Sequence, residues 1–68
     1  MTDADETEIE MVRRHIVEAE EHLARQREIV DRLPPSGGIT ELARSLLVQY
    51  EETLSLHRAH LARLLGQG

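Results

Sequence analysis

The sequence predicts an all-α fold, an antiparallel two-helix hairpin that dimerises into a four-helix bundle. The hairpin is indicated by a cluster of helix breakers, Leu33–Gly38 (LPPSGG), between two long segments whose apolar residues recur at helical spacing. The dimer is indicated by size and composition, because 68 residues without a cysteine can build neither a large core nor a disulfide.

The first helix is expected over about residues 4–33. Thr7-Glu8-Ile9-Glu10 fits a capping box, and the acidic residues near this start suit the positive end of the helix dipole. The apolar residues follow a heptad pattern that is typical of a packing seam. Ile9, Ile16, Leu23 and Val30 recur every seven residues, and Val12, Ala19, Gln26 and Leu33 fill the interleaved positions.

A turn is expected over about residues 34–38 and a second helix over about 39–65, with Thr40 as its cap, so that residues 1–68 form one domain. The apolar side chains of this helix cover an arc of roughly 140°, which is wider than one partner helix needs. They are Ile39, Leu42, Ala43, Leu46, Leu47, Tyr50, Leu54, Leu61, Leu64 and Leu65. The surplus predicts a second partner, and a second copy of the chain is the simplest one.

The predicted core and dimer interface combine the best apolar positions of both helices. They are Ile9, Val12, Ile16, Leu23, Val30, Leu46, Leu47, Tyr50, Leu54, Leu61 and Leu64. Gln26 and Thr53 interrupt these stripes, and polar residues at such positions often fix the register of packed helices.

The histidines form the one cluster in the sequence that could bind a metal ion or respond to pH. If Leu33 and Ile39 flank the turn, facing residues have numbers that sum to about 72, so His15 faces His57 and Val12 faces His60. One hypothesis is a metal site formed by His15, His57 and His60, with Glu18 or Glu8 nearby, that would suit Zn²⁺, Ni²⁺ or Cu²⁺. The alternatives are ordinary packed or partly solvated histidines, and a pH-sensitive packing in which protonation loosens the bundle.

Composition argues against several functions. The net charge of −5 disfavours binding to nucleic acids or anionic membranes, and no stretch approaches the apolar length of a membrane span. The acidic start, Met1–Glu10, lacks the apolar run of a signal peptide, so a cytoplasmic location is expected. No nucleophile–base arrangement and no phosphate-binding loop is present, so neither an enzymatic activity nor a cofactor is predicted.

The segments VRRHIVEAEEHLARQREIVDRL and TELARSLLVQYEETLSLHRAHLARL resemble a family of short bacterial helical-hairpin proteins of unknown function. This resemblance implies no activity and no functional residues. The layout is also similar to the ROP dimer, an RNA-binding four-helix bundle, but the phenylalanine and the basic face of such a protein are absent. The sequence therefore predicts a non-enzymatic interaction module that self-associates and that also binds an unknown protein partner. A metal-binding bundle and a ROP-like RNA-binding dimer are the alternatives.

Overall fold

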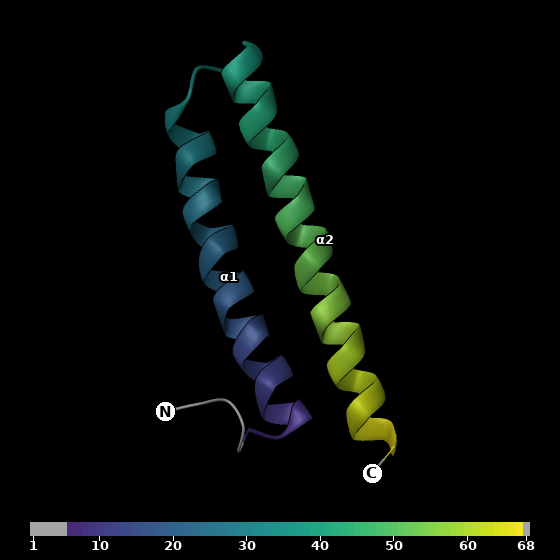
Figure 1. The fold of residues 1–68 in the computed structure, drawn as a ribbon. Coiled ribbons are helices and arrows are strands. Elements are labelled where there is room, and N and C mark those ends of the chain that lie inside the picture. Colours follow the sequence, from purple (N-terminus) through teal and green to yellow (C-terminus); the bar gives the residue numbers. More distant parts are fainter. Residues whose placement is uncertain (1–5, 68) are drawn as a thin grey trace.

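The computed structural model describes residues 6–67 and contains two helices joined by a short turn (Figure 1). Helix α1 spans Glu8–Arg32 and helix α2 spans Gly38–Gln67. The two helices lie antiparallel and side by side along their length, which confirms the predicted helical hairpin. The predicted start of the first helix at residue 4 lies outside the described residues, and within them α1 begins only after Thr7.

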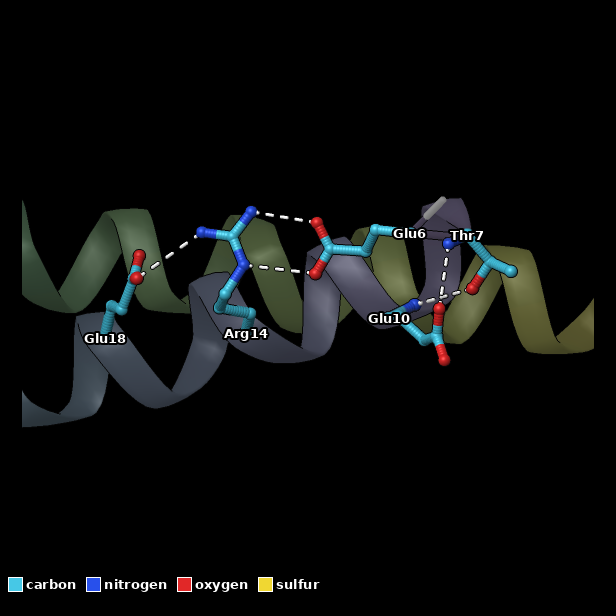
Figure 2. A network of polar contacts seen from close by, with 5 residues as sticks. All are labelled: Glu6, Thr7, Glu10, Arg14 and Glu18. Carbon is cyan, nitrogen blue, oxygen red and sulfur yellow. Dashed lines mark hydrogen bonds and ion pairs between the residues drawn. The ribbon is translucent and has the colours of Figure 1, made fainter. Parts of the chain in front are cut away.

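The start of α1 is fixed by the capping box that the sequence predicts (Figure 2). The backbone N–H of Glu10 donates to Thr7 Oγ1 over 3.1 Å, and the backbone N–H of Thr7 donates to Glu10 Oε1 over 2.9 Å. These reciprocal bonds satisfy two donors that the first turn of a helix leaves without intrahelical partners. The extended backbone of Thr7 then sets the point at which the helix begins.

The turn is set by prolines, a glycine and one threonine. Leu33 is extended, with φ −90° and ψ 158°, because the following Pro34 disfavours the helical conformation at the residue before it. Gly37 has φ 127°, which a residue with a β-carbon rarely adopts, and its carbonyl accepts the N–H of Glu41 at the start of α2. Thr40 is therefore inside α2, and the prediction that it caps the helix is wrong. Its buried Oγ1 instead donates to the Pro34 carbonyl over 2.9 Å, which ties the helix to the turn.

The core is a single seam between the helices. Every residue of the seam is buried or half-buried. Along both helices, successive seam residues are separated by three and four positions in alternation. The seam contains Ile9, Val12, Ile16, Ala19, Leu23, Gln26, Val30 and Leu33, together with Thr40, Ala43, Leu47, Tyr50, Leu54, His57, Leu61 and Leu64. Gln26 is 7% exposed, and its Nε2 donates to the Ala43 carbonyl over 2.8 Å, so this polar residue of the seam joins the two helices directly.

Most of the predicted core lies in this seam. Val12, Leu23 and Leu54 are buried, and the other predicted residues are half-buried, with one exception. Leu46 is 37% exposed and lies beside the seam, because α2 directs Ala43 and Leu47 toward α1 instead.

The predicted pairing of the helices agrees with two ring contacts. The ring centroids of His15 and His57 are 5.4 Å apart, and those of His22 and Tyr50 are 6.0 Å apart. Both pairs have residue numbers that sum to 72, as the position of the turn predicts.

The molecule is a thin layer. Its principal extents are 47 × 28 × 14 Å, so it is only one helix deep along its shortest axis. Within residues 6–67, neither helix carries a stretch long and apolar enough to cross a membrane. A layer of this thickness leaves much of each helix without a protein neighbour.

Candidate functional site

The seam divides the hairpin into two long flanks of different chemistry. Residues that follow the seam positions on one side of each helix form what we call the ion-pair flank, which consists of Arg13, Glu20 and Arg27 of α1 and Arg44, Glu51 and Arg58 of α2. The opposite side forms the histidine flank, which consists of Glu8, His15, His22 and Ile29 of α1 and Ile39, Leu46, Thr53 and His60 of α2. In an antiparallel helix pair, each of these sets lies along one edge of the seam.

The ion-pair flank is bridged by charges from both helices. Arg58 Nη2 lies 2.9 Å from Glu20 Oε2, and Arg27 Nη2 lies 3.6 Å from Glu51 Oε2. These side chains are about half exposed, so each pair is worth at most about 1 kcal/mol in stability. Their main consequence is that four of the six charged residues of this edge already have partners across the seam. The arginines of these two pairs therefore give no support to the RNA-binding alternative.

The histidine flank is hollowed along its middle. One depression, with a volume of about 320 Å³, is lined by His15, Glu18, Ala19, His22, Tyr50, Thr53 and His57. A second one of about 180 Å³ continues toward the turn, and His22 and Tyr50 line both. Its other lining residues are Arg25, Gln26 and Ile29. The depressions form a shallow groove over the seam, with imidazole and phenol rings on its walls.

The turn end of the histidine flank is apolar and exposed. Ile29 is 44% exposed, Ile39 75% and Leu46 37%, and Leu42, which adjoins them on α2, is 63% exposed. The predicted surplus of apolar surface on α2 is thus present. Ile39 and Leu46 belong to this flank and Leu42 adjoins it, whereas Leu65, 51% exposed, follows the seam on the other side. Exposed aliphatic side chains that cluster on one face indicate an interaction surface more strongly than scattered ones do.

The opposite end of the histidine flank is polar. His60 Nε2 lies 3.3 Å from Glu8 Oε2, so this contact joins the first residue of α1 to α2. The sequence predicts that His60 faces Val12. Val12 is 1% exposed in the seam, and the side chain of His60 lies against Glu8 on the first turn of α1.

The predicted metal ligands His15, His57 and His60 are divided between two contacts. His15 and His57 face each other, whereas His60 turns toward Glu8. In the part of the chain that the structure describes, no three His, Asp or Glu side chains are placed so that they could share one metal ion. The three-histidine metal site therefore gains no support from the geometry.

A further cluster lies at the start of α1 (Figure 2). Arg14 Nε donates to Glu6 Oε2 over 3.1 Å and its Nη2 donates to Glu6 Oε1 over 3.0 Å, while its Nη1 lies 3.5 Å from Glu18 Oε2. The bonds from Arg14 lower the pKa of the Glu6 carboxyl below its ordinary value of 4.5, because they favour the charged form. This cluster fastens the residue before the capping box to the second turn of α1.

The division into two flanks could not be found from the apolar pattern alone, because that pattern does not say which neighbours of the seam share an edge. The signal is in the sequence nonetheless. Once the seam is known, the residues next to it on one side of each helix are mostly charged, and the residues next to it on the other side are mostly aliphatic or histidine. Comparison with known proteins adds nothing to this geometry, since no protein-family model, curated protein or solved structure matches the chain.

Proposed function

We propose that this chain is a small non-enzymatic protein–protein interaction module that self-associates, with two hairpins packing through their histidine flanks into a four-helix bundle. The observation that supports this most directly is the contrast between the flanks. One edge of the seam carries two ion pairs between the helices, and the other carries exposed aliphatic side chains and a groove.

The exposed area fits the size of such an interface. The chain exposes 5174 Å², whereas a compact monomer of 7.8 kDa would expose about 4,400 Å². The difference of about 800 Å² matches the area that each partner contributes to a stable interface of ordinary size. A second hairpin laid over the thin dimension of the first would cover area of this extent.

Charge favours the histidine flank as the surface where two copies meet. Each copy carries a formal charge of −5, so two copies repel each other over most of their surfaces. Close approach requires an area with few fixed charges, and the histidine flank has only one carboxylate, Glu8, among its defining residues. A second copy also supplies the matching shape, because it is itself a pair of antiparallel helices.

The test is sedimentation equilibrium at micromolar concentrations with two matched variants. Leu46→Glu places a charge in the middle of the proposed interface, and Val48→Glu places the same charge on α2 outside the histidine flank, where Val48 is 51% exposed. The wild type and Val48→Glu should sediment as dimers. Leu46→Glu should raise the dissociation constant at least about 100-fold, because the twofold interface would bury two unpaired carboxylates.

Helicity, measured by circular dichroism on the same samples, separates lost association from lost folding. Leu42→Glu serves as a second variant of the flank if Leu46→Glu does not fold, because Leu42 is 63% exposed and contributes less to the hairpin itself. A wild-type chain that remains monomeric, helical and cooperatively folded at all concentrations would overturn the proposal. Equal weakening by Leu46→Glu and Val48→Glu would show that the interface lies elsewhere.

A further inference from the structure

All four histidines of the chain lie on or beside the histidine flank. His15, His22 and His60 belong to the flank, and His57 lies in the seam next to it and lines the same groove as His15 and His22. The ion-pair flank has none. A surface that would be covered by a second copy therefore carries every side chain of the protein whose type ordinarily changes charge between about pH 5 and 8.

The charged groups around these imidazoles differ from one to the next. His60 has the carboxylate of Glu8 at 3.3 Å and Arg63 one turn away along α2, and His22 shares its depression with Arg25 and Tyr50. Glu18 lines the groove with His15 and His57, but its carboxylate lies 3.5 Å from the guanidinium of Arg14. Among the described histidines, His60 alone has a carboxylate within 4 Å. The carboxylate of Glu6 also interacts with His15, since, besides the bonds from Arg14, a charge on His15 helps to lower the pKa of Glu6, and this interaction would offset part of the cost of a charge on the His15–His57 pair.

Protonation would affect association most at the pair His15–His57. The two rings are 5.4 Å apart and come from different helices. In an open hairpin, water solvates a charge on either ring. Under a second hairpin, two imidazolium ions would repel each other in a drier environment, and burial of even one charge without a partner is costly.

We propose that the histidine flank is a proton-controlled docking surface for a second copy of the chain, which binds when the His15–His57 pair is neutral and is released when this pair is protonated. The inference rests on the proposed function, since it describes how self-association through that flank is regulated. The ion pair between His60 and Glu8 strengthens on protonation, but both side chains are substantially exposed, so its effect is small.

The sign of the effect follows from linkage. The associated state favours neutral imidazoles, so its stability is fully present above the ordinary titration range of histidine and is lost as the pH falls through that range. If each copy must give up one proton, the dissociation constant should rise about 100-fold between about pH 7.5 and pH 5.5.

The overall charge predicts the opposite trend, which makes the test specific. Protonation of all four histidines would move the formal charge of each copy from −5 toward −1. General repulsion between copies therefore decreases on acidification, and association driven by net charge alone would become tighter. Weaker association at the lower pH would identify a local effect within the interface.

The experiment is sedimentation equilibrium of the full chain at about pH 7.5 and pH 5.5, at constant ionic strength and with helicity measured in parallel. The variant His15→Gln/His57→Gln removes the charge of the pair but keeps polar side chains, and His60→Gln is the matched control. The wild type and His60→Gln should show the rise in the dissociation constant. The double variant should show less than a threefold change. If the double variant does not fold, His15→Gln alone replaces it, since His15 is only half-buried and its substitution should leave the hairpin folded. This single variant should reduce the rise in the dissociation constant at least about threefold.

The outcomes distinguish the two proposals. A wild type that is dimeric with equal affinity at both pH values overturns proton control and leaves self-association intact. A wild type that is monomeric at both values overturns self-association itself. A rise in the dissociation constant that persists unchanged in the double variant, or in His15→Gln if that variant must replace it, overturns the assignment to the His15–His57 pair.

Discussion

Replacing Thr40 by Val tests whether the turn is held by the bond from Thr40 to Pro34. Thr40 is 2% exposed, and its hydroxyl donates to the Pro34 carbonyl over 2.9 Å. Valine has nearly the same shape, so the substitution removes the hydrogen bond without opening a cavity. A neutral hydrogen bond of this kind contributes about 1 kcal/mol net, and the carbonyl of the exposed Pro34 can be rehydrated, which keeps the penalty near that value.

A loss of about 1 kcal/mol should lower the Tm by about 4–8 °C for a chain of this size. The assay is thermal unfolding followed by circular dichroism at one fixed protein concentration, because association shifts the apparent stability. Thr40→Ser and Thr40→Ala form a matched pair that differs only in the hydroxyl, and the serine variant should be more stable by a similar amount. A valine variant as stable as the wild type, together with equal stability of the serine and alanine variants, would refute the reasoning.

Three further predictions concern α1 and its seam. Val12→Ala should reduce the free energy of unfolding by about 2 kcal/mol in urea titrations, because Val12 is 1% exposed and its methyl groups leave a cavity; a loss under about 0.5 kcal/mol would contradict this. Gln26→Leu should change stability by less than about 1 kcal/mol in the same assay, because the Ala43 carbonyl keeps its helical N–H donor when the side-chain bond is lost. A carboxyl titration by NMR should place the pKa of Glu6 below 4.5, and Arg14→Gln should raise it. Since the folded-state pKa is lowered, the contribution of Glu6 to stability is present above the ordinary pKa and is lost as the pH falls through the lowered value.

The hairpin was predictable because its determinants are local. Two prolines and two glycines stop one helix and start the next, and the capping box at Thr7 needs only residues four positions apart or fewer. The pairing of His15 with His57 was also predictable, because a short turn fixes which residues of two straight helices lie opposite each other.

The details that were not predicted depend on where individual side chains turn. Thr40 fits the preference for a cap, but the positive φ of Gly37 lets the helix begin earlier and frees the hydroxyl for the turn. The heptad position of His60 allows several contacts, and the structure places its Nε2 3.3 Å from Glu8 Oε2 instead of beside the other histidines. Leu46 is apolar enough for a core, and only the burial of its neighbours Ala43 and Leu47 places it on the flank.

The bridged edge has a consequence for how far assembly can proceed. Glu20 with Arg58 and Arg27 with Glu51 form ion pairs along that side of every hairpin, so a third copy that docks on this edge of a dimer would have to compete with charges that already have partners. Two copies that meet through the same flank would also form a closed twofold pair, because each copy then covers the surface that the other would use to bind a further copy.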